Sequence, residues 1–343
     1  MQHEENFKEY IVAFEKQLDF VVIDDISSTS YCKRYLAYLL QHKKYYLAIY
    51  ADVLHKLVQH SSKSKTGIVL IDYGSGNGLL GIFAKFCGFK KVFLTDIDAK
   101  FIQASEKLAA QLNIKMDGYL TGDIHTVQGY FKNETPDAIA GTDVIEHIYN
   151  PENFFTGLQQ INQSIVSVLT TASNPNNYYR VSKLKRFQIK DELKGGNPGD
   201  HILFGESPLE PFLKIREEII RKFRQNLAEV EIFDLAKNTR GMNKQDIEAA
   251  VEHYNKTGEF PNPPAHKTNT CNPFNGSWTE RILTLKEYTL LYTAAGFKPI
   301  FYNGFYNVYE GGIKSYGKKI LNSGIAVFGD KISPYIVIVG YRS

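Results

Sequence analysis

The segment over residues 69–80, VLIDYGSGNGLL, constrains the fold most. An apolar run ends at Asp72, three glycines follow at alternate positions, and small and apolar residues come next. This order is typical of a buried strand, a tight turn and a helix. Glycine lets the backbone turn sharply and approach a ligand closely, and the helix start presents free N–H groups. The segment therefore predicts a ligand-binding loop at the end of a strand.

Two familiar classes of glycine loop do not fit this segment. The dinucleotide fingerprint GxGxxG needs its third glycine at the position of Leu79, but Gly78 comes one place early. This disfavours an NAD-dependent oxidoreductase. A phosphate-binding P-loop is excluded because no Gly-Lys-Ser/Thr follows the glycines.

Strand-like and helix-like stretches alternate on both sides of the loop. We expect strands near residues 68–71, 92–95, 118–121, 137–141 and 165–171. Helices are expected near 101–112 and 151–163, and a helix at 285–295 precedes two closing strands, after 296 and at 335–340. Such alternation is typical of βαβ units, so it predicts an α/β fold with a parallel sheet covered by helices.

Three parts of the chain differ in pattern. Residues 1–60 are helical by periodicity, with apolar residues of 31–57 three, four and seven positions apart. Residues 174–283 are polar and irregular apart from helical stretches near 208–227 and 246–255. Loops of this length are usually functional. We therefore predict an N-terminal helical cap (1–60), a core (61–173 and 284–343) and an inserted substrate cover (174–283).

Composition narrows the classes of partner and compartment. The 343 residues carry a net charge of +3 from 40 basic and 37 acidic residues, too balanced for a dedicated nucleic-acid binder. The three cysteines form no CxxC pair, which favours a reducing compartment. The N-terminus does not resemble a signal peptide, and no apolar run approaches 18 residues. We therefore expect a cytoplasmic protein without a membrane partner; the oligomeric state is not predicted.

Acidic residues follow the next strands at informative distances. Asp96 comes 18 residues after the last loop glycine, where a carboxylate can accept hydrogen bonds from both hydroxyls of a ribose. Asp98 fits a helix N-cap. Asp123 could accept from the exocyclic amine of adenine, with Ile124 against the ring. Asp72 could hold a cationic group of a ligand or simply tie down the loop.

Four runs in order, LIDYGSGNG, TDID, GDI and DAIAGTDVIEHIYNP, resemble the class I S-adenosylmethionine-dependent methyltransferases, in their small-molecule O-methyltransferase-like branch. The resemblance covers residues 67–173 and, more loosely, 284–342. It implies a Rossmann-like sheet of seven mostly parallel strands with helices on both faces, and places the large insertion after the fifth strand. The cofactor it implies, S-adenosyl-L-methionine, would lie over the carboxyl ends of the first strands.

The resemblance also implies cofactor contacts at nine positions. Those around the methionine part are Asp72, Gly74, Gly76 and Gly78. Those around the ribose and adenine are Asp96, Ile97, Asp123 and Ile124. Thr142 would lie beside the sulfonium. Some family members bind the cofactor without methylating anything, so a non-catalytic cofactor-binding partner protein is one alternative.

Glu146 and His147 follow the fourth strand, next to where the cofactor methyl should point. Methyl transfer from a sulfonium is an in-line displacement that depends mainly on alignment. A base is needed only when the nucleophile must lose a proton, as a hydroxyl does. We predict His147 as this base, with Glu146 beside it and His201 as a further group acting on the acceptor. Alternatively, Glu146 and His147 form a structural hydrogen-bonded turn.

A metal-dependent version is a second alternative. Relatives among ubiquinone-pathway O-methyltransferases and small-RNA 2′-O-methyltransferases carry Glu-x-x-Glu-His here and bind a divalent ion. This chain has Asp143 in place of the first glutamate, and His201 lies 54 residues beyond His147. Together with Glu146 these groups would suit a divalent ion that holds a substrate diol. Because Asp143 is one methylene shorter than glutamate, our prediction includes no metal.

The segment over residues 269–281 is the most unusual part of the insertion, with the only tryptophan of the chain, several amides and a charged pair. Trp278 and Arg281 are predicted to bind the acceptor, because an aromatic platform with polar groups suits a sugar. Alternatively, Trp278 only anchors a polar loop. We expect methyl transfer to a hydroxyl of a small polar acceptor, such as a sugar or glycosylated metabolite. Nucleic acid is not expected, although a basic run at 180–186 leaves RNA as an alternative.

Overall fold

The computed structural model describes residues 7–26, 29–195 and 210–342. The chain divides into two compact units. Unit 1 comprises Met1–Ile145, Pro151–Asn177 and Thr284–Ser343, and unit 2 comprises Glu146–Asn150 and Tyr178–Leu283. The N-terminal helices thus belong to unit 1 together with the sheet. The three-part division made from the sequence stays a prediction.

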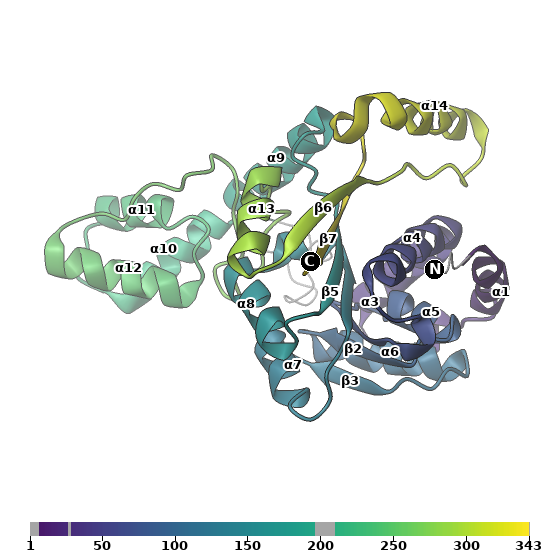
Figure 1. Ribbon diagram of the computed structural model, residues 1–343. Helices are drawn as coiled ribbons and strands as arrows, with labels where there is room; N and C mark the ends of the chain where they lie inside the picture. The colour runs from purple at the N-terminus through teal and green to yellow at the C-terminus, as the bar shows by residue number, and fades with distance from the viewer. Residues whose placement is uncertain (1–6, 27–28, 196–209, 343) are drawn as a thin grey trace. The chain divides into compact units, whose positions relative to one another are not determined.

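Unit 1 is built on one seven-stranded sheet with the order β3-β2-β1-β4-β5-β7-β6 (Figure 1). Its strands are β1 (Val69–Tyr73), β2 (Lys91–Asp96), β3 (Gly118–Thr121), β4 (Ala138–Thr142), β5 (Val166–Thr171), β6 (Lys298–Asn303) and β7 (Ile336–Tyr341). The first five strands pair in parallel, and β7 is antiparallel to both β5 and β6. Every residue of β1 and β5 is buried, as expected for strands covered on both faces. The predicted α/β fold with seven mostly parallel strands is confirmed.

Helices cover both faces of this sheet (Figure 1). On one side lie α4 (Lys43–His60), α5 (Leu79–Phe86) and α6 (Ala99–Gln111). On the other lie α7 (Ile124–Tyr130), α8 (Pro151–Ile161) and α13 (Leu285–Ala294). Helix α14 (Gly312–Phe328) and a 3₁₀ turn, η3 (Gly329–Lys331), connect β6 to β7. The predicted helices at 101–112, 151–163 and 285–295 are confirmed with small shifts of their ends.

The N-terminal helices are α1 (Lys8–Leu18), α2 (Ile23–Ile26), α3 (Ser30–Gln41) and α4. The continuous helical pattern of 31–57 is broken at His42, where ψ rises to 24° and the residue's N–H bonds to the carbonyls of Tyr38 and Leu39. Phe14, Leu36 and Val53 are fully buried in the same hydrophobic core as the sheet. The N-terminal helices therefore form part of the main core.

The strand order identifies where a ligand of this sheet should bind. The chain moves outward from β1 to β2 and β3, and then returns to β4 on the other side of β1. The direction of the strand order thus reverses between β1 and β4. Open α/β sheets bind ligands outside the carboxyl ends of the strands at such a point. The glycine loop after β1 and Asp143 after β4 both lie there.

Unit 2 contains α9 (Tyr178–Leu193), α10 (Phe212–Phe223), α11 (Glu229–Asn238) and α12 (Lys244–Thr257). The sequence patterns did not predict α9, α11 or α14. Helix α9 was missed because its buried side includes Gln188, Asp191 and Glu192, so it has no apolar period. The fully buried Arg216 on α10 pairs with Glu192 and donates to the Ala236 carbonyl at 2.8 Å. In the described part of the chain, no helix is both long and apolar enough to span a bilayer.

Candidate functional site at the carboxyl ends of the strands

The glycine loop between β1 and α5 has the predicted tight geometry. Gly74, Gly76 and Gly78 all have positive φ, at 65°, 53° and 80°. A Cβ on Gly78 would lie 2.7 Å from the Cβ of Ser105, and one on Gly74 would lie 2.3 Å from Val144 Cγ2. Glycine is therefore required at these two positions by backbone conformation and by packing within the protein, whatever ligand the loop holds.

Asp96, the last residue of β2, holds this loop in place. Its Oδ2 accepts the Gly76 N–H at 2.9 Å, and its Oδ1 accepts the Asp98 N–H at 2.9 Å. Burial raises its pKa to about 6, although these backbone N–H groups act in the opposite direction. Each carboxylate oxygen can still accept a second hydrogen bond. Asp96 can therefore hold the loop and accept from ligand hydroxyls at the same time.

Asp72 lies one strand away and is almost completely buried. Its Oδ2 accepts the Gly81 N–H at 2.8 Å, which ties the end of β1 to the first turn of α5. Burial raises its pKa to about 7; the Gly81 N–H lowers it in part, and the nearby Asp96 raises it. The structural alternative from the sequence is thus seen directly. Binding of a cationic ligand group by Asp72 stays a prediction.

Three side-chain oxygens around the loop are buried without a hydrogen-bond partner among the described residues: Ser75 Oγ, Asn77 Oδ1 and Thr95 Oγ1. An unpaired buried polar group costs about 1–3 kcal/mol, so such groups are usually satisfied by a ligand or water. Two buried carboxylates lie in the same loop region. These groups fit a ligand that carries hydroxyl and ammonium donors, as S-adenosylmethionine does.

The residues predicted at the adenine differ in their accessibility. Ile97 is 62% exposed at the end of β2, so its side chain can contact a ring. Asp123 caps α7 by accepting the N–H groups of His125 and Thr126 at 3.0 and 3.3 Å. Ile124 is buried against α8, where a Cβ on Gly157 would lie 2.5 Å from its Cγ1. The adenine contacts stay predictions, and Ile97 is the best placed to make one.

The end of β4 carries a strained residue. Thr142 is partly buried, and the next residue, Asp143, has a φ of 53°, which non-glycine residues seldom adopt. The Asp143 N–H bonds to the carbonyl and the hydroxyl oxygen of Thr170, at 3.1 and 3.2 Å. Strain of this kind tends to occur at functional sites. It turns the chain sharply beside the glycine loop, and no sequence pattern predicted it.

Tyr35 on α3 is a candidate that the sequence did not suggest. Its ring lies 3.2 Å from the position that a Cβ would take on Gly76. The ring stacks on Tyr31 with 6.3 Å between centroids, and it meets Phe101 edge-on at 5.8 Å. Burial, followed by the negative charge of Asp143, raises the pKa of Tyr35, so its hydroxyl stays neutral. Tyr35 therefore covers the glycine loop from the N-terminal helices.

His147 lies in unit 2, in a short segment that also contains Glu146. Its Nδ1 is 2.8 Å from the Trp278 carbonyl oxygen, and the Trp278 N–H donates to the His147 carbonyl at 3.3 Å. Because a carbonyl only accepts, Nδ1 carries the proton and Nε2 has the free lone pair in the neutral ring. Glu146 is fully buried, and its carbonyl accepts the Arg281 N–H at 3.1 Å. The predicted catalytic and acceptor-binding residues thus meet within unit 2.

Trp278 is enclosed by its neighbours. Its indole N–H donates to the Tyr149 carbonyl at 3.1 Å, and the two rings stack at an interplanar angle of 21°. The Arg281 guanidinium lies 4.3 Å from the Trp278 ring centroid. A Cβ on Gly241 would lie 2.8 Å from the ring edge. These contacts favour the anchoring alternative for Trp278, while a direct role in acceptor binding stays a prediction.

The metal alternative depends on a residue outside the described ones. His201 falls in 196–209, of which the structure describes nothing. Within the described residues, no group of three or more His, Cys, Asp or Glu side chains could hold a metal ion. The roles of His201 on the acceptor and in a metal site therefore remain untested predictions.

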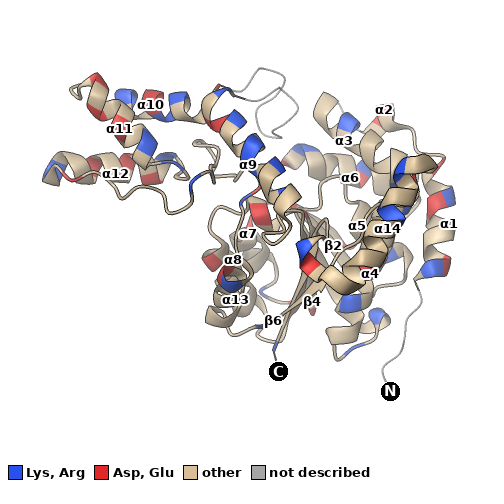
Figure 2. Ribbon diagram, turned by 90° about the horizontal axis from the view of Figure 1, so that it is seen from above, with Lys and Arg blue, Asp and Glu red and all other residues tan. Residues whose placement is uncertain are grey.

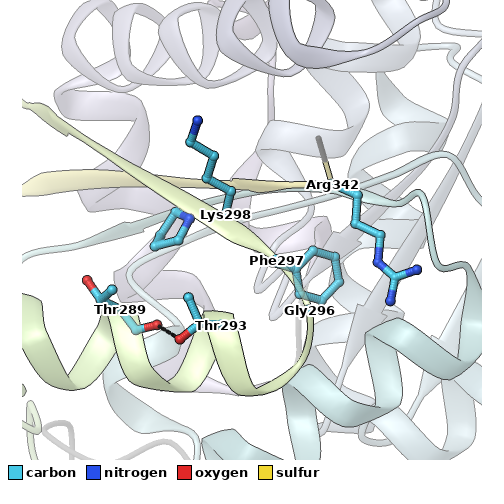
Figure 3. Close-up of a pocket in the computed structure, with 7 residues that line it drawn as sticks. Thr289, Thr293, Gly296, Phe297, Lys298 and Arg342 are labelled. Carbon is cyan, nitrogen blue, oxygen red and sulfur yellow. Dashed lines mark hydrogen bonds between the residues drawn. The ribbon is translucent and has the colours of Figure 1, made fainter.

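A surface hollow lies at the opposite end of the sheet. It is lined by α13 and the adjoining ends of β6 and β7, including Thr289, Lys298 and Arg342 (Figure 3). Because β7 is antiparallel to β5 and β6, the start of β6 and the end of β7 lie at the amino ends of the parallel strands. The hollow is thus remote from the glycine loop and does not belong to the candidate site.

Comparison with known proteins identifies the family of the core. Residues 71–164 match the family model of a methyltransferase domain. A ribosomal protein L11 methyltransferase of Acinetobacter baumannii (strain AYE) is 38% identical over 71 residues, which is 21% of this chain and 23% of that protein. Another, of Dichelobacter nodosus, is 46% identical over 55 residues, 16% of this chain and 18% of that protein. The chain thus spans about a fifth of the length of these relatives.

Among solved structures, an S-adenosylmethionine-dependent methyltransferase from Archaeoglobus fulgidus aligns at 11% identity and a TM-score of 0.44, covering 90% of this chain and 99% of its own. The YcgJ protein of Bacillus subtilis aligns at 9% identity and a TM-score of 0.40, over 85% of this chain and 98% of its own. Scores this low add nothing to the family match. The matched segment contains the glycine loop and the first strands, and it identifies the core as a class I S-adenosylmethionine-dependent methyltransferase domain.

Proposed function

We propose that the chain transfers a methyl group from S-adenosylmethionine to a hydroxyl of a small polar acceptor. The observation that carries the choice of a hydroxyl is the hydrogen bond between His147 Nδ1 and the Trp278 carbonyl. It fixes the tautomer whose Nε2 accepts a proton. A hydroxyl must lose its proton to become a strong nucleophile, and a histidine with a free nitrogen is the usual base.

The cofactor would be held by the groups around the glycine loop. Asp96 would accept from the ribose hydroxyls, Ile97 would contact the adenine, and Asp72 would face the cationic methionine part. The buried oxygens of Ser75 and Thr95 offer further partners. When bound, the cofactor supplies an electrophilic methyl group on a positively charged sulfur. The two carboxylates have pKa values raised by burial, so a cation nearby favours their ionised form.

The chain's own residues have three tasks in this proposal. His147 takes the hydroxyl proton at Nε2 while the acceptor oxygen bonds to the methyl carbon and the carbon–sulfur bond breaks. The Trp278 carbonyl holds the ring and stabilises the imidazolium that results, since Nδ1–H still points at it. Tyr149 and Arg281 pack around Trp278 and position it. His147 lies five residues after Thr142 along the chain, and Thr142 is the position predicted beside the sulfonium.

The nature of the acceptor rests on weaker grounds. Relatives named as ribosomal protein L11 methyltransferases match over 55 to 71 residues only, so a protein acceptor is not carried over to this chain. A sugar or glycosylated metabolite suits the amide-rich segment at 269–281. The near-neutral total charge disfavours RNA. A partner protein that binds the cofactor without catalysis is the remaining alternative.

The test is transfer of radiolabelled methyl from S-adenosylmethionine to a panel of sugars, glycosides, short RNAs and L11-type proteins. We expect hydroxyl acceptors among the sugars and glycosides to be labelled. His147→Gln should lower kcat by about 100- to 10,000-fold, the usual contribution of a general base. Its Kd for S-adenosylhomocysteine should stay within about threefold of wild type, because His147 makes no predicted cofactor contact.

His253→Gln is the matched control, since His253 lies on α12 of the same unit with an exposed side chain. It should leave kcat unchanged. Labelling that survives in His147→Gln would rule out His147 as the base. Labelling of RNA or protein alone would overturn the small-acceptor proposal, and cofactor binding without labelling of any acceptor would favour the non-catalytic alternative.

A further inference from the structure

Helix α14 presents its apolar side to the solvent. Ile313, Tyr316 and Val327 are 93%, 69% and 77% exposed. Three further side chains on the same stripe are exposed large apolar ones, Ile320, Leu321 and Phe328. At about 100° per residue, all six fall within an arc of about 140°. An ordinary surface helix turns such a stripe toward the core, so α14 is reversed.

Polar contacts fix this orientation. Ser315 is the only buried residue of α14, and its hydroxyl donates to the Val308 carbonyl. Asn322 bonds to the backbone of Tyr306 in both directions, accepting its N–H at 2.7 Å and donating to its carbonyl at 3.1 Å. The side of the helix that faces unit 1 is therefore polar, and the apolar stripe is left outside by construction.

The charges on α14 are all of one sign. The helix contains Lys314, Lys318 and Lys319 and no acidic residue, and its lysines appear blue in Figure 2. By the same angular spacing, Lys314 and Lys319 lie just beyond opposite edges of the apolar stripe. The acids that flank the helix are engaged elsewhere, since Glu310 pairs with Lys318 and Asp330 accepts from the Asn176 amide at 2.7 Å.

We infer that α14 binds the surface of an anionic lipid bilayer, with its apolar stripe among the headgroups and upper acyl chains and its lysines against the lipid phosphates. A helix with an exposed apolar stripe and a lysine-rich rim is typical of one lying in the membrane interface. A second copy of the chain would suit the stripe less, because it would bring two lysine rims together. This inference departs from the sequence expectation of no membrane partner, and it does not depend on the proposed reaction.

The experiment is co-sedimentation of the full chain with vesicles of phosphatidylcholine alone, or of phosphatidylcholine mixed with phosphatidylglycerol. We expect binding to the anionic vesicles and little binding to the neutral ones. Replacing three exposed side chains together, Ile313→Ser, Tyr316→Ser and Val327→Ser, should weaken binding at least about tenfold, because most of the inserted apolar surface is lost. Lys314→Gln with Lys319→Gln should weaken it too and reduce its sensitivity to salt.

The matched control replaces apolar side chains exposed elsewhere in unit 1, Val12→Ser and Leu290→Ser, and should bind vesicles as wild type does. Circular dichroism melts establish that each variant is folded. Equal binding to both vesicle types, or equal loss in the control, would overturn the inference. So would a wild-type chain that ignores vesicles but forms a dimer in sedimentation velocity, if the α14 variant is monomeric; α14 would then be a self-association surface.

Discussion

Replacing Asp72 with asparagine tests the electrostatics of the candidate site in the ligand-free protein. Asparagine keeps an oxygen for the Gly81 N–H but cannot ionise. Burial raises the pKa of Asp72 from 3.8 to about 7 in the fold. Because the folded pKa is the higher one, Asp72 makes its full contribution to stability below about pH 3.8. That contribution is lost as the pH rises through about 7.

The magnitude follows from the size of the shift. A pKa raised from 3.8 to about 7 corresponds to a cost of at most about 4 kcal/mol for holding the ionised carboxylate buried at pH 8. The asparagine side chain of the variant would avoid this cost, but its amide N–H₂ group needs partners, which returns about 1–3 kcal/mol. We therefore expect Asp72→Asn to raise the free energy of unfolding by roughly 1–3 kcal/mol near pH 8. Near pH 5 the variant should be no more stable than wild type.

The assay is urea unfolding of both proteins at several pH values between about 5 and 8, without ligand. Asp25→Asn, at an exposed position, is the control and should change stability by less than about 0.5 kcal/mol at every pH. Parallel stability curves for wild type and Asp72→Asn would refute the reasoning, because they would show that Asp72 does not titrate in this range.

Three further predictions concern single contacts. Tyr35→Ala should weaken binding of S-adenosylhomocysteine several-fold in calorimetry while Tyr35→Phe keeps it, because the ring covers the glycine loop; equal loss in both variants would assign the effect to the hydroxyl. Gly78→Ala should lower Tm more than Gly88→Ala, since both glycines have positive φ but only Gly78 meets other side chains at its Cβ position. Equal losses in a thermal melt would contradict the packing argument. Trp278→Phe should cost about 1–2 kcal/mol of unfolding free energy, because the Tyr149 carbonyl loses its donor; an unchanged denaturation midpoint would show that Trp278 is no anchor.

The sheet and the cofactor half of the site could be predicted from the sequence because their signals are local. Residues 69–80 combine an apolar run, three glycines and a helix start within twelve positions. The strand ends that carry Asp96 and Asp123 follow at the spacing that βαβ units impose. The strand over 118–121 was placed to the residue although it is weak in composition.

The remaining features depend on packing between distant parts of the chain. Tyr35 becomes a candidate only because α3 lies over the glycine loop, 41 residues later in the sequence. The buried polar side of α9 and the outward apolar side of α14 both reverse the usual pattern, so periodicity failed for each. The tautomer of His147 is fixed by a carbonyl 131 residues away. No local pattern encodes these contacts.

Calorimetric titration with S-adenosylhomocysteine, with NAD as the comparison ligand, tests the central claim most directly. Asp96→Ala and Asp98→Ala are measured beside wild type, because Asp98 only caps α6. S-adenosylhomocysteine should bind in the micromolar range or tighter, and NAD should not. Asp96→Ala should lose about 1–3 kcal/mol of binding free energy while Asp98→Ala loses much less. Folded wild-type protein that binds neither ligand, or an Asp96→Ala variant that binds as well as wild type, would contradict the account.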